Sequence, residues 1–291
     1  MQANPTFLRN DPVFWAHIRT ISEKIGYTYR RTHPYAGQIR SYSASELVDA
    51  MQTMGLQTTH LVGSSAQPTP MATIIAAYTE HRASLLNNVV ADYLMHAEQA
   101  RTLYTQIVQH YPVHRLPVMN RQTGAKKQPM YLTGIVNALI EYHVHGRPCD
   151  YDPKRLPTFT RAGIPIRTLS RRVDGCFPAC VNPIALWEIK EYYHTTTFGS
   201  RIADGIYETL LDGMELAELH AREGVRVDHL LVVDSDQWWL KGKSYLCRII
   251  DLLHMGYVQE VLFGSEVVER LPVIVQAWCE QFDRAAPEQI P

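Results

Sequence analysis

Three residues near the middle of the chain, Asp174, Glu188 and Lys190, have types and spacing suited to phosphate chemistry. Glu188 and Lys190 stand in the stretch IALWEIKEYY, whose apolar and aromatic residues predict a strand. Alternate residues of a strand point to the same face, so these two side chains should lie side by side. Asp174 lies fourteen positions before Glu188, where a preceding strand is expected to end. Pairing of the two strands would bring the two carboxylates together.

Two neighbouring carboxylates repel each other unless a cation lies between them. Mg²⁺ is the natural occupant, because it prefers oxygen ligands and also accepts phosphate oxygens. A lysine beside the metal would orient or activate a water molecule and meet the charge that develops on a phosphate. The three residues therefore predict hydrolysis of a phosphodiester.

The spacing D-x13-E-x-K on adjoining strands resembles the PD-(D/E)xK nuclease superfamily, which includes many restriction endonucleases. The predicted order helix, strand, strand, helix, strand from residue 130 onward also resembles the core of that family. The resemblance implies that Asp174 and Glu188 bind Mg²⁺ and that Lys190 serves the attacking water. Glu141, in the helix before the first strand, matches a glutamate that many members add to the metal site. The chain departs from the pattern at Val173, where the family often has proline.

The resemblance implies a Mg²⁺-dependent, sequence-specific endonuclease of double-stranded DNA, similar to type II restriction enzymes. Because cleavage of both strands needs two active sites, we expect a homodimer, with a separate DNA methyltransferase as its genetic companion. Two alternatives stay open. One is a non-catalytic DNA-binding or assembly protein on the same fold, in which Glu188 and Lys190 form a solvated pair on an edge strand. The other is a phosphoesterase that uses Asp234 and Asp236, at the end of another predicted strand.

Basic residues are concentrated in one part of the chain. Residues 112 to 172 carry eleven Lys or Arg against three Asp or Glu, whereas residues 200 to 291 carry eight against sixteen. A basic segment of this kind favours contact with a polyanion, and most DNA contacts go to phosphates. The residues that we expect to contact DNA are Arg30, Arg31, Lys126, Lys127, Arg167, Arg171, Arg172 and His194.

The elements that must position these residues divide the chain in two. Capping residues and helical spacing predict helices over 11–26 and 43–55, and one or two helices over 69–111 that end at Pro112. We therefore expect a helical region over 1–111 that serves DNA binding or dimerisation. A basic connector rich in Pro, Gly and Lys follows over 112–129, and a nuclease-like core over 130–291.

The core region alternates between strand and helix patterns. Helices are predicted over 130–144, 201–224, 242–256 and 265–285, and strands over 163–175, 184–193, 228–236 and 258–264. The two central strands are close enough to form a hairpin. This order predicts an α/β (α+β) fold with a mixed central sheet flanked by helices, a restriction-endonuclease-like core.

The composition is that of an ordinary globular chain, with 46% hydrophobic and 20% charged residues. No apolar stretch has the length of a membrane span, and the N-terminus lacks a signal-peptide pattern, so we expect a cytoplasmic protein without a membrane partner. The odd number of cysteines fits reduced thiols better than a disulfide framework. A zinc site built from Cys149, Cys176 and Cys180 with His143 and His145 matches no common spacing.

Overall fold

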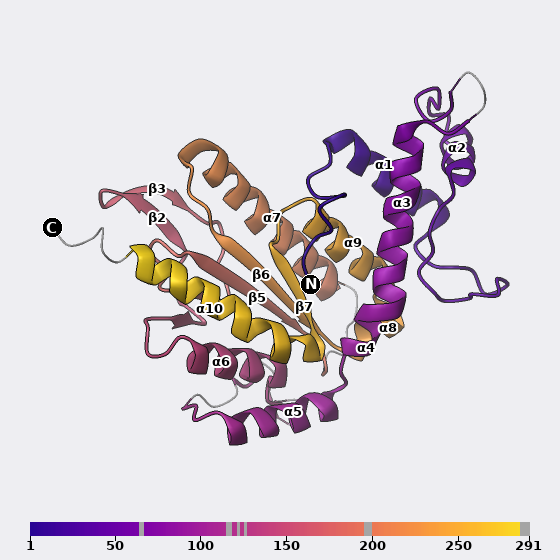
Figure 1. The fold of residues 1–291 in the computed structure, drawn as a ribbon. Helices are drawn as coiled ribbons and strands as arrows, with labels where there is room; N and C mark the ends of the chain where they lie inside the picture. The colour runs from indigo at the N-terminus through magenta and orange to yellow at the C-terminus, as the bar shows by residue number, and fades with distance from the viewer. Residues whose placement is uncertain (64–66, 115–117, 121–122, 125–126, 195–199, 286–291) are drawn as a thin grey trace.

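The computed structural model describes residues 1–63, 67–114, 118–120, 123–124, 127–194 and 200–285. These residues form a five-stranded mixed sheet with helices on both faces and a helical N-terminal region at one side (Figure 1). The predicted class, a mixed central sheet flanked by helices with a mainly helical N-terminal region, is confirmed.

The sheet has the order β1-β4-β5-β6-β7. Its strands are β1 (Asp150–Tyr151), β4 (Gly175–Phe177), β5 (Ala185–Glu191), β6 (Asp228–Asp234) and β7 (Glu260–Phe263). The first three pair antiparallel, and β5, β6 and β7 run parallel. The central strand β5 is buried along nearly its whole length, as expected for an apolar strand covered on both faces.

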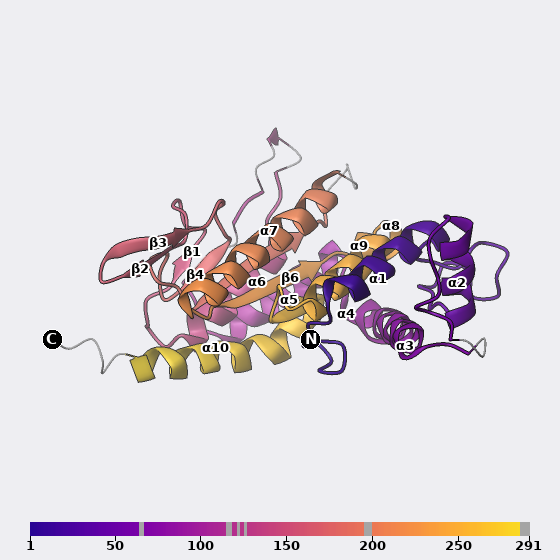
Figure 2. The same ribbon diagram turned by 90° about the horizontal axis from the view of Figure 1, so that it is seen from above.

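Helices cover both faces of the sheet. α6 (Tyr131–His143) and α10 (Val267–Ala285) pack on one face, and α7 (Ser200–Glu223) and α9 (Lys243–His254) on the other. Figure 2 shows α7 and α10 on opposite sides of the strands. The short helix α8 (Asp236–Lys241) follows β6, and a 3₁₀ turn, Gly264–Glu266, leads from β7 into α10.

The stretch predicted as one strand over 163–175 is divided between two elements. β3 (Ile164–Thr168) pairs with β2 (Thr158–Arg161) in a separate two-stranded sheet. Ala162 and Gly163 both have positive φ, and this tight turn closes the hairpin. Asp174 therefore stands directly before the first residue of β4 rather than at the end of a strand.

The N-terminal region contains α1 (Pro12–Ile25), α2 (Ala44–Thr53) and α3 (Pro70–Leu85). Each begins at a side-chain cap, because Asp11, Ser43 and Thr69 accept hydrogen bonds from backbone N–H groups of the first turn. The predicted helix over 69–111 continues through a π-helical turn, Leu86–Val90, and a short α4, Ala91–Tyr93, and then breaks. It resumes as α5 (Ala97–His110).

The helical region is joined to the core by buried contacts. α5, which the expected boundary at 111 places in the helical region, packs against α6 of the core. Arg82 of α3 is fully buried and donates to Asp251 of α9 at 3.0 Å. The amino group of Met1 donates to Val261 O at 2.8 Å.

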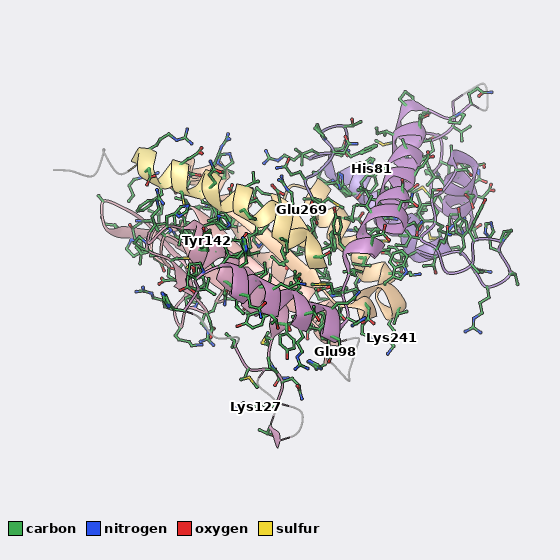
Figure 3. The ribbon with its side chains drawn as sticks, turned by 60° about the horizontal axis from the view of Figure 1, so that its bottom comes forward. His81, Glu98, Lys127, Tyr142, Lys241 and Glu269 are labelled. Atoms are coloured by element: carbon green, nitrogen blue, oxygen red, sulfur yellow. The ribbon has the colours of Figure 1, made fainter. Side chains whose placement is uncertain are left out.

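Described residues of the connector after α5 project from the body of the molecule (Figure 3). Met119 and Pro129 form an isolated β-bridge, and Lys127 lies near the tip of the projection (Figure 3). Within the described residues, no helix has the length and apolar character to cross a membrane.

Candidate functional site

Glu188 and Lys190 lie on the face of β5 that α7 covers. Only 1% of Glu188 and 9% of Lys190 is exposed. Their neighbours Trp187 and Ile189 point the other way, into the apolar cluster with α6 and α10. Because β5 is the middle strand of the sheet, Glu188 and Lys190 are not a solvated pair on an edge strand. That part of the alternative interpretation is wrong.

Asp174 stands beside Glu188 across the antiparallel pair of β4 and β5. Gly175 pairs with Trp187, so the preceding residue comes opposite Glu188. Asp174 Oδ2 accepts a hydrogen bond from Ile189 N at 2.7 Å, inside the Glu-x-Lys segment. Burial and the neighbouring Glu188 raise the pKa of Asp174 to about 7. The structure thus brings together the three residues that the sequence pattern singled out.

The position after Asp174 has room only for glycine, Gly175. A Cβ atom at this position would lie 1.9 Å from the ring of Trp187, which sits over the strand. A glycine is therefore required for β4 to approach β5 closely and hold Asp174 at its place.

Two further acids and an arginine complete a largely buried cluster, which we call the β5–α7 ion network: Glu188, Lys190, Arg171, Glu208 and Asp212. Lys190 Nζ donates to Glu188 at 2.9 Å and to Glu208 at 2.8 Å. Arg171 lies 2.9 Å from Glu188, 2.6 Å from Asp212 and 3.3 Å from Glu208. Glu208 and Asp212 are four residues apart on α7 and so share one face of the helix.

The carboxylates around this network outnumber the cations. Among the described residues, Asp174, Glu188, Glu208 and Asp212 surround two cations, Lys190 and Arg171. Burial raises the pKa of Asp212 to about 7. Its Oδ1 is buried and has no hydrogen-bond partner among the described residues. The network would therefore accept more positive charge than its own two cations supply.

Lys190 and Glu188 stabilise each other's charged forms. Burial by itself would lower the pKa of Lys190, but Glu188, Asp174 and Glu208 hold it above its ordinary value. Burial would raise the pKa of Glu188, but Lys190 and Arg171 together hold it below the ordinary value. Both groups are therefore charged at neutral pH.

Asp174 and Glu188 are chemically suitable ligands for Mg²⁺. The ion is commonly held by one or two carboxylates together with phosphate oxygens. In the part of the chain that the structure describes, one group of three ligand side chains has its atoms within 4.8 Å of one another, and it is Asp150, Cys176 and Cys180 instead. A Mg²⁺ ion at Asp174 and Glu188 would thus need further oxygens, from backbone carbonyls, water or a phosphate.

A cavity of about 490 Å³ opens beside Asp174. Its wall includes Asn137 of α6, Glu191 at the end of β5, and His194. Asn137 Oδ1 and His194 Nε2 are buried atoms without hydrogen-bond partners among the described residues. Glu191 Oε2 accepts from Thr133 N at 3.0 Å, at the start of α6, and burial raises its pKa to about 7. The cavity thus presents polar groups to one side of Asp174.

Glu141 lies away from this cavity. Its Oε1 accepts from His114 N at 3.2 Å. It follows Thr133 by eight residues on α6, or about 12 Å along the helix axis. The structure does not bring it to Asp174, and Asn137, one turn earlier, lines the cavity instead. Asn137 is a polar residue inside an otherwise apolar helix, four residues before Glu141, and this pattern could have indicated it from the sequence.

The residues expected to contact DNA lie in several places. Arg171 belongs to the ion network, and Arg167 pairs with Glu218 of α7. His194 lines the cavity. Arg172 and Lys127 are exposed, as are Arg30 and Arg31, in the segment between α1 and α2. Figure 1 shows these two helices at the opposite end of the molecule from the β2–β3 hairpin. Lys126 lies outside the described residues.

Asp234 and Asp236 do not form an open pair. Asp234 is fully buried; its Oδ1 accepts from Met95 N at 2.8 Å and its Oδ2 accepts from the hydroxyl of Tyr193. Burial raises the pKa of Asp234 to about 8. Asp236 Oδ1 accepts from Gln237 Nε2 at 3.3 Å. Both oxygens of Asp234 are thus used inside the fold, which gives the phosphoesterase alternative little support.

Fold and site define an α/β protein with a helical N-terminal region, whose central strand carries a buried Glu-x-Lys pair opposite an aspartate. The chain belongs to a family described as Domain of unknown function (DUF7687), whose model matches residues 95–278. A second model, Domain of unknown function (DUF7690), matches residues 1–89. Searches of curated proteins and of solved structures found no match.

Proposed function

We propose that the protein is a Mg²⁺-dependent endonuclease of double-stranded DNA, with Asp174, Glu188 and Lys190 at its active site. The observation that carries this proposal is the meeting of Asp174 with the buried Glu188 and Lys190 on two paired strands. Three ionisable residues at that spacing would be costly in the middle of a sheet unless they paired or served a function.

The order of elements supports the proposal. α6, β4, β5, α7 and β6 follow one another as helix, strand, strand, helix, strand, with Asp174 directly before β4 and Glu188 on its antiparallel partner β5. This is the order on which the resemblance to the PD-(D/E)xK core rests. β1 and the β2–β3 hairpin are inserted between the helix and the first of these strands.

In this proposal Asp174 and Glu188 would hold Mg²⁺, which would supply a more acidic water and positive charge for the phosphate. Lys190 remains protonated at neutral pH, so it donates hydrogen bonds and stabilises negative charge rather than accepting a proton. Asp174 must be ionised to bind a cation, and because its pKa is raised to about 7, it loses its proton readily only above about pH 7 when no cation is bound.

Access to Lys190 requires one contact of the ion network to open. The side chain of Glu208 is 43% exposed, whereas those of Glu188 and Asp212 are buried. Glu208 is thus the partner of Lys190 that can turn toward solvent and leave a place for a phosphate. By the same resemblance we propose a homodimer that cuts both strands at a specific sequence, with a DNA methyltransferase as companion.

The test is digestion of plasmid and phage DNA, methylated and unmethylated, with Mg²⁺ and with EDTA. Lys190→Met should abolish cleavage, because it removes the charge and keeps much of the buried stem. Lys24→Met, at an exposed position in the last turn of α1, is the matched control and should cut like the parent chain. Circular dichroism and thermal melting show whether each variant is folded.

Discrete bands that require Mg²⁺ and disappear only in the Lys190 variant would support the proposal. Intact DNA with the parent chain under every condition would overturn it. DNA binding without cleavage would then favour the non-catalytic alternative, in which the β5–α7 ion network is a structural link.

A further inference from the structure

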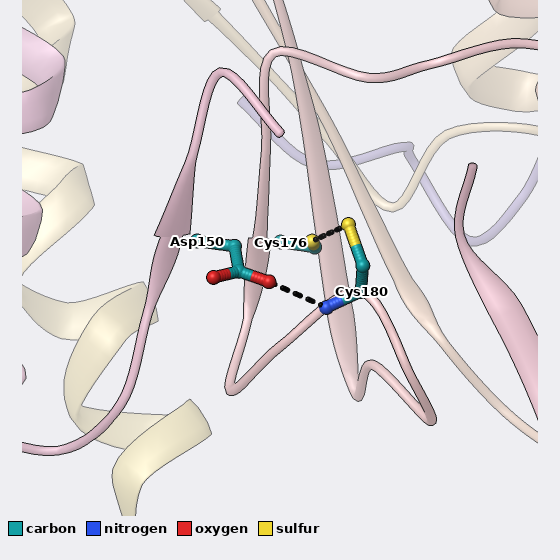
Figure 4. A group of neighbouring side chains, drawn as sticks. All are labelled: Asp150, Cys176 and Cys180. Carbon is teal, nitrogen blue, oxygen red and sulfur yellow. Dashed lines mark hydrogen bonds between the residues drawn. The ribbon is translucent and has the colours of Figure 1, made fainter. Parts of the chain in front are cut away.

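A cluster of sulfur and oxygen ligands lies near the start of β4, close to Asp174 in the chain. Figure 4 shows Asp150, Cys176 and Cys180 facing one another. Their ligand atoms all lie within 4.8 Å of each other. The two Sγ atoms are 3.1 Å apart, and Cys180 N donates to Asp150 Oδ2 at 2.9 Å.

Three separate segments build this cluster. Asp150 of β1 pairs directly with Cys176 of β4, so both side chains are on one face of the sheet. The turn after β4 then brings Cys180 back beside Asp150. Cys149 precedes Asp150 and packs against the apolar cluster on the opposite face of the sheet. Alternation along β1 thus selects Asp150 and leaves Cys149 out.

The surroundings make the cluster short of positive charge. Both thiols are fully buried, in an apolar cluster that includes Phe159 and Leu186. Arg155, whose side chain is largely exposed, lies at the edge of the cluster, and its guanidinium group is 3.5 Å from Asp150 Oδ2. Burial, the contact with Cys180 and the charge of Asp150 raise the pKa of the Cys176 thiol. Without a bound cation the Cys176 thiol therefore stays protonated.

The donor set indicates which ion would fit. Two sulfurs and one carboxylate suit Zn²⁺, a borderline-soft ion that takes four ligands, and do not suit Mg²⁺, which prefers oxygen. Zn²⁺ would convert both thiols to thiolates and release their protons. The charge of the ion would then offset the negative charges of the two thiolates and the carboxylate within the apolar cluster.

We propose that Asp150, Cys176 and Cys180 bind one Zn²⁺ ion, with water as the fourth ligand. The ion would tie the edge strand β1 and the turn after β4 to β4 itself. Asp152 N, two residues after Asp150, donates to Asp174 O at 2.8 Å. A zinc ion here would thus steady the segment that carries Asp174. This site is additional to the proposed Mg²⁺ site and does not depend on it.

The test uses the full chain, purified under reducing conditions without chelator. Zinc content by mass spectrometry should be about one ion per chain. After zinc removal, titration with Co²⁺ should produce a thiolate-to-cobalt charge-transfer band in the near ultraviolet. Cys180→Ser should lose the band, and Asp150→Asn should weaken Co²⁺ affinity by about tenfold or more. Cys149→Ser is the matched control and should keep both signals.

Two outcomes would overturn the zinc site. One is a folded parent chain without zinc and without a thiolate band on Co²⁺ addition. The other is a Cys176–Cys180 disulfide found by mass spectrometry in protein purified with thiol reductant. Since Cys180→Ser alters a buried position, circular dichroism must show that it is folded; Asp150→Asn, at a half-buried position, is the second variant. Lys190→Met should keep the cobalt band, which separates this test from the nuclease test.

Discussion

Asp174 bears on both the proposed chemistry and the stability of the fold. Its carboxyl group is held by the backbone of Ile189 and lies beside Glu188 in a partly buried place. Ionisation of a carboxyl group in this setting costs free energy unless a cation is bound beside it. Such raised pKa values are typical of functional sites, where a bound ion compensates the charge.

The first prediction concerns the pH dependence of stability. Folded Asp174 keeps its proton up to about pH 7, whereas in the unfolded chain it ionises near 3.8. The folded state therefore binds more protons between these values, and its stability falls as the pH rises through that window. Asp174→Asn removes this contribution. We expect urea unfolding at pH 8 to show a gain on the order of 2 kcal/mol for the variant.

Well below pH 3.8 the variant and the parent chain should be equally stable, since Asp174 is then protonated in both states. Asp49→Asn, at an exposed position of α2, is the control and should change little. If the free energy of unfolding depends on pH equally in the parent chain and in Asp174→Asn, then the proton on Asp174 does not contribute to stability.

At the scale of elements, the β5–α7 ion network links the central strand to the helix that covers it. Arg171 is its connecting residue, because it contacts Glu188 on the strand and both Glu208 and Asp212 on the helix. Losing one partner of a buried ionic group is more costly than losing an exposed pair, since the remaining charges stay buried and unpaired.

The second prediction separates a structural role of Arg171 from DNA contact. Arg171→Met should lower the free energy of unfolding by about 3–5 kcal/mol, because it leaves the buried Asp212 without its cation and Glu188 with Lys190 alone. Arg167→Met, which removes only a partly exposed pair with Glu218, should cost about 0–1 kcal/mol. Urea unfolding at pH 7 measures both.

A stable Arg171→Met variant with weakened DNA binding would contradict this structural role. It would return Arg171 to the set of residues that contact phosphate. Salt dependence of DNA binding would then show a smaller slope for this variant than for the parent chain.

At the scale of the whole molecule, the helical region and the core share one buried polar contact zone. Arg82 donates to Asp251, and Tyr78 OH donates to the same carboxylate at 2.6 Å. Met1 reaches β7 and the 3₁₀ turn through Val261 and Glu266. One family model matches the helical region and another matches the core. These buried contacts join the two parts, and breaking one of them leaves a buried charge without its partner.

The third prediction is that the chain unfolds in one cooperative step. Arg82→Met should lower the stability of the whole molecule by about 3–5 kcal/mol, because Asp251 is left buried without its cation. Far-ultraviolet circular dichroism and tryptophan fluorescence should give the same midpoint. Arg101→Met, which removes an exposed pair with Glu98 on α5, is the control and should have little effect. Two separate transitions would show that the parts fold independently.

Local patterns predicted much of this molecule. The helices capped by Asp11 and Ser43 begin where expected, because capping depends on residues within one turn. The strand around Glu188 and Lys190 was predicted with both side chains on one face, since alternation is a property of any strand. The mixed sheet with flanking helices followed from the alternation of these patterns.

Tertiary structure decided the partners of these residues. The chain itself required that Glu188 and Lys190 share a face, but only the packing of α7 on β5 placed Arg171, Glu208 and Asp212 around them. Likewise, only the pairing of β1 with β4 brought Asp150 to Cys176. Capping and alternation arise from interactions between near neighbours in the chain, whereas ion networks and ligand clusters depend on which distant segments bury their apolar faces together.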